Sequence, residues 1–159
     1  MSLLSLDQAK AHCRVGSGYP DDQIQPYVDA AEVAAVAYLN RAVFASQGDL
    51  DAARDALPAT AAASDAAYQA AVTAAAAMPN VVQRQTAIDV AEARRDESSI
   101  TSTRVVEGIV VNAAILSAIR LTLGHLFTNR EAVVVGAPVA ELPLGATMLL
   151  RPYRRVMAL

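Results

Sequence analysis

Few residues in this 159-residue chain have the types and spacing that catalysis or metal binding requires. His12 and Cys13 are adjacent, so on a helix their side chains point about 100° apart, which suits a shared metal site poorly. His125 could titrate near neutral pH, but it lies in an apolar helical pattern, where a hydrogen-bonded core or interface histidine is the commoner outcome. With nearby carboxylates, these three residues define one alternative hypothesis, an enzyme or metal protein.

The other charged pairs have structural interpretations. Asp21 and Asp22 precede a long helical pattern, where carboxylates suit the cap and the positive end of the helix. Arg130 and Glu131 fit an ion pair at a helix end. No phosphate-binding glycine loop, nucleophile elbow, HExxH motif or cysteine pair occurs in the sequence. We therefore expect no enzyme, no cofactor and no catalytic or metal-ligating residue.

Composition excludes further classes of protein. Thirteen Lys and Arg residues against sixteen Asp and Glu residues give a net charge of −3, too acidic for a protein that grips nucleic acid through its phosphates. The single cysteine excludes a disulfide framework. The first ten residues lack the basic and apolar regions of a secretory signal, so we expect a reducing cytoplasm.

Charge is distributed unevenly along the chain. Residues 1–46 carry a balance of −2, residues 47–103 a balance of −4, and residues 104–159 a balance of +3. A basic C-terminal part on an acidic protein indicates either head-to-tail self-association or an acidic partner. A simple solvated C-terminus is the alternative.

The N-terminal third predicts two helices. Ser5 is the expected N-cap of a short helix that ends near His12, and a Gly- and Pro-containing break follows at residues 16–20. In the next helix, over 24–43, apolar residues recur at helical spacing at Ile24, Val28, Ala31, Ala35, Tyr38 and Ala42. Val33, Val36 and Val43 lie off this stripe. The helix is thus apolar on more than one side, which predicts cover from a partner subunit.

Residues 49–101 predict an alanine-rich helical hairpin. A short helix over 49–57 is expected to stop at Pro58, and twelve of the next nineteen residues, 59–77, are alanine, the best helix former. Pro79 and Asn80 separate this segment from a polar helix that runs to about Ser98. Because these helices have few large apolar side chains, the hairpin should be weakly packed. A flexible low-complexity spacer is the alternative.

Residues 104–129 predict the strongest helix. Its nineteen-residue apolar run, 109–127, approaches membrane-spanning length. Arg120 near the middle of the run would cost at least about 2.5 kcal/mol on insertion scales, so a helix buried in a protein assembly fits better. After it we expect an extended segment at 132–135 and a last helical turn at 144–150 that ends at Pro152.

The residues alone thus predict an all-α, bundle-like subunit with a short extended segment near the C-terminus and more apolar surface than one chain covers. Two blocks add a resemblance. The first consists of LDQAKAHCRV at 6–15 and DDQIQPYVDAA at 21–31; the second consists of HLFTNREAV at 125–133, ELPLGA at 141–146 and LLRPYR at 149–154. Together they resemble the head–tail connector, or head-completion, proteins of long-tailed double-stranded DNA bacteriophages. The resemblance covers residues 3–46 and 104–155.

The chain departs from that family's pattern in two ways. Family members are shorter, so residues 48–101 are interpreted as an insertion within a single connector domain that spans 1–159. Gly16 also stands where an acidic residue is common in the family.

The resemblance implies a structural virion protein. It would form an oligomeric ring of about twelve copies at the head–tail junction, assembled in the host cytoplasm. The ring would lie beneath the portal protein and continue the DNA channel toward a head-closure or tail protein. DNA would pass without specific binding, and no membrane would be involved.

On this hypothesis one set of residues forms the contacts with a neighbouring subunit or the portal: Val33, Val36, Leu149, Leu150, Pro152, Tyr153, Arg154 and Arg155. Deletion of 149–159 is expected to leave a helical monomer that no longer assembles. The alternative is a generic helical adaptor that binds another protein without forming rings.

Overall fold

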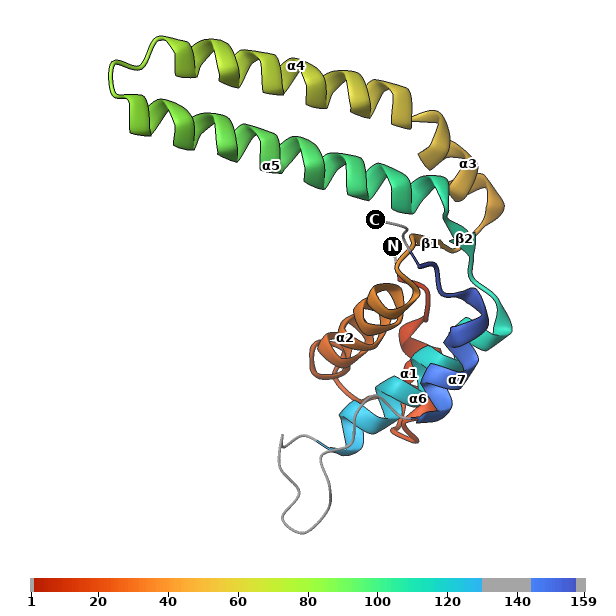
Figure 1. The fold of residues 1–159 in the computed structure, drawn as a ribbon. Helices are drawn as coiled ribbons and strands as arrows, with labels where there is room; N and C mark the ends of the chain where they lie inside the picture. The colour runs from red at the N-terminus through yellow and green to blue at the C-terminus, as the bar shows by residue number, and fades with distance from the viewer. Residues whose placement is uncertain (1, 130–143, 157–159) are drawn as a thin grey trace. The chain divides into compact units, whose positions relative to one another are not determined.

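The computed structural model describes residues 2–129 and 144–156, and these are mostly helical, as the sequence predicts (Figure 1). The chain divides into two compact units. We call the first, made of Met1–Gln47 and Ile109–Leu159, the core unit, and the second, Gly48–Gly108, the hairpin unit.

The first two helices of the core unit begin close to where the sequence predicts. Helix α1 (Leu6–His12) begins at Ser5, whose hydroxyl accepts a 3.3 Å hydrogen bond from the Gln8 N–H, so the predicted cap is confirmed. Helix α2 (Asp21–Leu39) begins after Pro20, and no side chain caps it. The predicted capping by the aspartates is therefore wrong: the Asp21 carboxylate lies 2.6 Å from Lys10 Nζ and joins the start of α2 to α1.

Helix α2 ends at Leu39, not at residue 43 as predicted. Asn40 adopts the left-handed conformation (φ 52°), which asparagine tolerates better than most residues and which ends the helix. Strand β1 (Val43–Phe44) follows and pairs in parallel with β2 (Ile109–Val110), with Val43 opposite Ile109. Val43 is thus a strand residue rather than part of a second apolar helix face.

The single helix predicted over 104–129 is wrong. Helix α5 (Val81–Val106) ends before Gly108, the chain passes through β2, and helix α6 (Ala113–Thr128) begins at Asn112, whose side chain accepts a hydrogen bond from the Ile115 N–H. The β-branched residues at 109–111 favour an extended backbone, which explains the interruption. No helix in the described ranges is long and apolar enough to cross a membrane.

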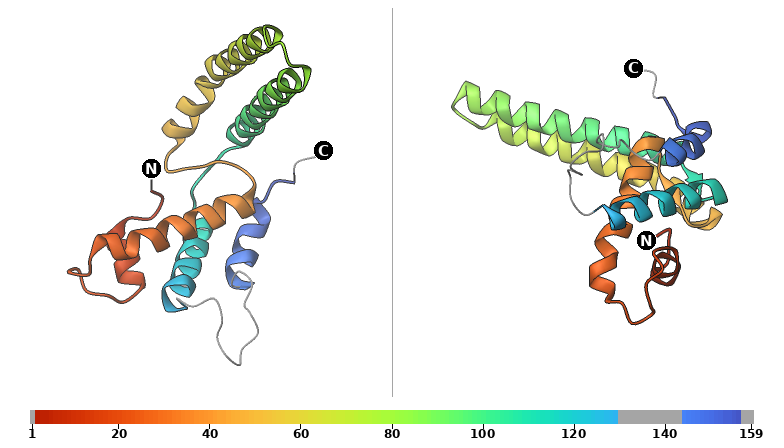
Figure 2. Two further views of the ribbon diagram at one scale, coloured as in Figure 1. Left: turned by 90° about the vertical axis from the view of Figure 1, so that its left-hand side faces the viewer. Right: turned by 90° about the horizontal axis from the view of Figure 1, so that it is seen from below.

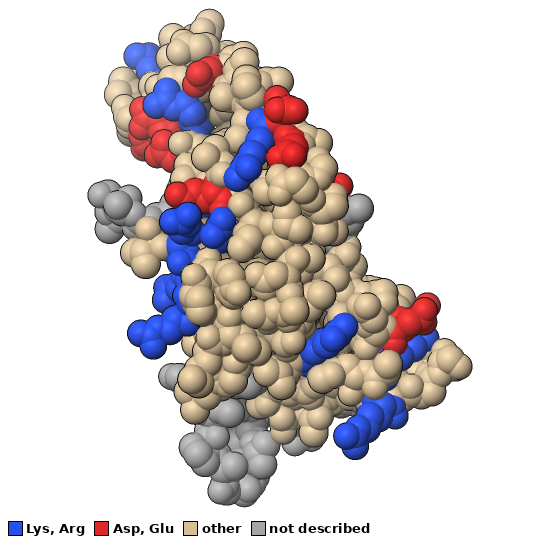
Figure 3. Space-filling view, turned by 90° about the vertical axis from the view of Figure 1, so that its right-hand side faces the viewer, with Lys and Arg blue, Asp and Glu red and all other residues tan. Residues whose placement is uncertain are grey.

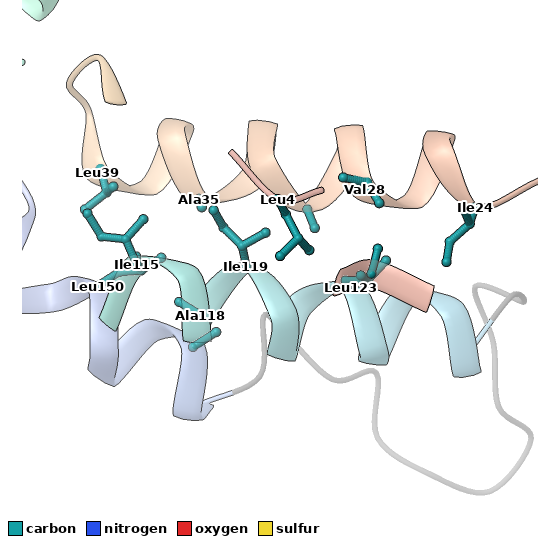
Figure 4. Packing of buried hydrophobic residues seen from close by; sticks show 13 residues of the cluster. Leu4, Ile24, Val28, Ala35, Leu39, Ile115, Ala118, Ile119, Leu123 and Leu150 are labelled. Atoms are coloured by element: carbon teal, nitrogen blue, oxygen red, sulfur yellow. The ribbon is translucent and has the colours of Figure 1, made fainter. Parts of the chain in front are cut away.

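The core lies where α2 packs on α6 and α6 packs on α7 (Leu144–Leu150) (Figure 4). Helix α6 lies between the other two, and α7 continues as the 3-10 turn η1 (Arg151–Tyr153). The fully buried side chains include Leu4, Ile24, Val28, Leu39, Ile115, Ile119, Leu123 and Leu150. The predicted helical spacing at 24, 28, 31 and 35 is confirmed as the buried face of α2. The predicted helical turn at 144–150 is also confirmed, and it contributes Ala146 and Leu150 to the core.

The hairpin unit consists of α3 (Gln47–Asp55), α4 (Leu57–Ala76) and α5 (Figures 1 and 2). The expected hairpin is present, because α4 and α5 pack along their lengths. Pro58, expected to stop the first helix, lies in the first turn of α4, where its missing N–H removes no helical bond. Asn80 caps α5 as predicted, but α5 continues past Ser98 to Val106.

Small residues line the contact between α4 and α5. Ser64 and Ala71 on α4, and Ala91 and Ser98 on α5, lie seven residues apart on the less exposed side of each helix. Ala75 and Ala91 are the buried residues of these two helices, at 0% and 6% exposed. Arg95 lies over the ring of Tyr68, at 4.4 Å from its centre. Alanine buries little apolar area, so this contact stabilises the hairpin modestly.

The extended segment predicted at 132–135 and the pair Arg130–Glu131 lie outside the described residues.

Candidate assembly interface

The outer face of α2 carries an acidic and apolar stripe. Asp29, Val33 and Ala37 are exposed at helical spacing on the side opposite the core, and 67% of Val33 is exposed. Val36 lies nearer the core and is half-buried. The two valines that the sequence predicts as interface residues therefore differ in exposure: Val33 is accessible to another chain, and Val36 is only partly so.

The outer face of α7 carries a second stripe. Leu144 and Met148 are 83% and 73% exposed, and Arg151 is exposed one turn further along. Leu121 of α6 is also exposed and lies beside α7, since a Cβ atom placed on Gly145 would be 3.6 Å from its Cδ1. Sequence analysis missed Leu144 and Met148, although their i, i+4 spacing ahead of Arg151 was a signal that could have found them.

Four of the predicted C-terminal residues have different environments. Leu150 is 1% exposed and belongs to the core, and Leu149 and Tyr153 are half-buried against it. Pro152 is exposed. In this structure Leu150 is therefore not accessible to a neighbouring subunit.

Arg154 and Arg155 lie at the C-terminal end of α2 in the same chain. The Arg155 N–H donates to the Leu39 carbonyl at 2.9 Å, and Asn40 Nδ2 donates to the Arg155 carbonyl at 3.3 Å. The Arg154 guanidinium lies 5.1 Å from the centre of the Tyr38 ring, while both arginines remain exposed. The backbone of this segment thus completes the fold of the core unit, and its charged groups face outward.

This placement changes how the C-terminus can be tested. Deletion of 149–159 would remove Leu150 from the core together with the bonds to Leu39 and Asn40. It would therefore impair folding as well as any docking, and substitution of exposed side chains is the cleaner experiment.

The structure describes the surroundings of the three residues considered for catalysis, His12, Cys13 and His125. Cys13 is half-buried, and burial raises the pKa of its thiol. His12 packs against α6, where a Cβ atom on Gly124 would lie only 3.2 Å from its Nε2, and His125 Nδ1 lies 3.2 Å from Asn129 Nδ2. Within 2–129 and 144–156, no three His, Cys, Asp or Glu side chains are grouped so that they could hold a metal ion.

Helices that cover a small core while exposing apolar stripes are suited to packing against other protein chains. Comparison with protein families agrees with a protein that packs against other protein chains. Residues 4–154 match the family of phage gp6-like head–tail connector proteins. The chain belongs to this family, which has a structural role in the virion. No curated protein and no solved structure matches the chain.

Proposed function

We propose that this chain forms a closed ring at the head–tail junction, beneath the portal, and continues the DNA channel toward the tail. Membership of the connector family supports this location. The observation that supports a ring is the exposure of two different apolar surfaces on one chain. One is Val33 on α2, and the other is Leu144 and Met148 on α7.

The positions of these two surfaces favour a ring over a dimer. A two-fold dimer uses one patch on both subunits, whereas contact between two different patches repeats from copy to copy and closes when the rotation permits. About twelve copies would weigh about 200 kDa, since one chain has a mass of 16.6 kDa.

The partners follow from this location. The portal protein would contact one side of the ring, and a head-closure or tail protein would contact the other. Val36, Pro152, Tyr153, Arg154 and Arg155 remain proposed contacts with a neighbour or with the portal, while Leu149 and Leu150 would support these contacts from inside the fold. Assembly would take place in the host cytoplasm, and residues 48–101 would be an insertion into the connector domain.

The charge of the chain suits a conduit rather than a DNA-binding protein. Figure 3 shows one face on which acidic and basic side chains are interspersed over a largely uncharged surface. Proteins hold duplex DNA when their Lys and Arg side chains neutralise phosphates and release counterions. In a chain with a net charge of −3, the excess of carboxylates opposes these contacts, so passing duplex would not be held. We expect no binding of a fluorescent duplex by the full chain at physiological salt; saturable binding in an anisotropy titration would contradict this.

Electron microscopy of the purified portal of the same phage, with and without this chain, tests the proposal. We expect an additional ring on one end of the portal only when the chain is present. Binding of single copies without a ring would support the generic adaptor, and no binding at all would refute the connector role. The portal without the chain is the control.

A further inference from the structure

We propose that α2 of one copy packs antiparallel against α7 of the next copy, with Asp29 facing Arg151 and Val33 facing Met148. This inference rests on the proposed ring and identifies the surfaces that join its subunits.

The stripe on α2 changes character along the helix. Its N-terminal half exposes Asp22 and Asp29, and its C-terminal half exposes Val33 and Ala37. Gln25 donates a 2.7 Å hydrogen bond to Asp29 Oδ1. The Oδ2 atom can accept from a basic group on another chain.

The stripe on α7 has the opposite order. Leu144 and Met148 come first, and Arg151 follows at the C-terminal end. Over the described parts of the chain, no acidic side chain pairs with the Arg151 guanidinium. Leu121 extends the apolar part of this surface.

The spacing of the two stripes selects the antiparallel arrangement. At about 1.5 Å per residue, Asp29 and Val33 are about 6 Å apart along α2. Met148 on α7 and Arg151, the first residue of η1, are about 5 Å apart along the same axis, because the 3-10 turn rises about 2 Å per residue. When the helices run in opposite directions, Asp29 meets Arg151, Val33 meets Met148 and Ala37 meets Leu144. When they run in the same direction, the carboxylate meets Leu144 and the guanidinium meets Ala37, which would desolvate both charges without pairing them.

A second copy is the occupant that fits both surfaces. The acidic and apolar stripe and its basic and apolar complement are on the same chain, but both are exposed, at Val33 and at Met148, outside the core in which α2, α6 and α7 pack together (Figure 4). Because both stripes are exposed, neither covers the other within the chain, and a second copy can supply the complement of each. Such a contact repeats in one direction, as a ring requires.

Charge exchange tests the pairing. In the full chain, Asp29→Arg and Arg151→Asp should each lower the fraction of portals that carry a ring by at least about tenfold, because like charges then face each other. The double variant D29R/R151D restores opposite charges at every contact and should recover ring formation. Glu92→Arg, the same change of charge on exposed α5, is the matched control and should form rings as the wild type does.

Disulfide trapping tests the geometry independently of charge. In a Cys13→Ser background, Val33→Cys with Met148→Cys should give a ladder of cross-linked multimers on the portal, since paired cysteines need Cα atoms about 6 Å apart. Either cysteine alone should give no ladder. Asp22→Cys with Met148→Cys is the matched control, because Asp22 is exposed on α2 but lies about 16 Å from Val33 along the helix.

The outcomes separate this inference from the proposed function. If the wild-type chain forms rings but the double charge variant does not recover, or V33C/M148C gives no ladder, the pairing is wrong and the ring remains. Dimers from V33C alone would indicate a two-fold contact and would also overturn the pairing. If the wild type forms no ring on the portal, the proposed function fails, and the pairing fails with it.

Discussion

The Glu32 carboxylate attaches the N-terminal segment to α2. Its Oε1 accepts hydrogen bonds from the Leu3 and Leu4 N–H groups, at 2.8 and 2.9 Å, and from the Ser2 hydroxyl at 2.8 Å. These bonds hold Leu4 with its side chain buried in the core. Because no regular secondary structure pairs these N–H groups, the carboxylate supplies the acceptor that they need.

Glu32→Ala should therefore lower the free energy of unfolding by about 1–3 kcal/mol, because it leaves partly buried N–H groups without an acceptor. Urea unfolding followed by circular dichroism measures this change. Glu92→Ala, which removes an exposed carboxylate from α5, is the matched control and should change the value by less than about 0.5 kcal/mol. Equal effects of the two substitutions would contradict the role given to Glu32.

At the scale of elements, the contact between α4 and α5 depends on the absence of large side chains. Ala75 is 0% exposed against α5, whereas the neighbouring Ala76 is exposed. A methyl group lets the helices lie close together, and a longer side chain at position 75 would separate them. The alanine content of 59–77 thus has a packing role in addition to its helix propensity.

Ala75→Leu should destabilise the hairpin by about 1–3 kcal/mol, because an overpacked contact forces the backbones apart. Amide hydrogen exchange across 57–106 measures the effect, and faster exchange is expected throughout α4 and α5. Ala76→Leu is the matched control and should leave exchange unchanged. Unchanged exchange in Ala75→Leu would show that the two helices do not pack through this residue.

Elements with clear periodicity or clear caps could be predicted from the sequence. The stripe from Ile24 to Ala35 indicates the buried face of α2, and Ser5 and Asn80 mark helix starts. The interruption at 107–112 was missed because the apolar pattern continues through it; the Asn112 cap and the pairing of β1 with β2 decide the local structure there. That pairing joins residues far apart in the chain, so local pattern cannot show it.

The candidate interface could be predicted in part. Val33 lies off the apolar stripe, and its exposure follows from that position. Leu150 was assigned to the interface because hydrophobicity does not distinguish a buried contact within the chain from one between chains. The i, i+4 spacing of Leu144 and Met148 places them on one side of a helix, but the packing of α7 on α6 decides that this side faces outward.

At the scale of the whole molecule, the hairpin unit is inserted between two paired strands. Its ends continue into β1 and β2, which are hydrogen-bonded neighbours, for example through the Ile109 N–H and the Ala42 carbonyl at 2.9 Å. The core cluster includes no residue of 48–108. The fold of the core unit therefore depends little on the hairpin.

Replacement of 48–108 by a Gly- and Ser-rich linker of about eight residues, which spans the gap between paired strands easily, should leave the core unit folded. Its cooperative thermal unfolding and dispersed NMR spectrum would be retained. A molten or insoluble product would show that the core unit requires the hairpin.

The central claim is that copies of this chain form a ring around a channel, in which the exposed stripe on α2 of one copy is buried against the stripe on α7 of the next. The most direct measurement is a cryo-electron microscopy map of the chain bound to the portal. The account predicts a closed ring in which the outer face of α2 lies against α7 of the next subunit. Separate copies on the portal, with Val33 and Met148 still in solvent, would contradict it.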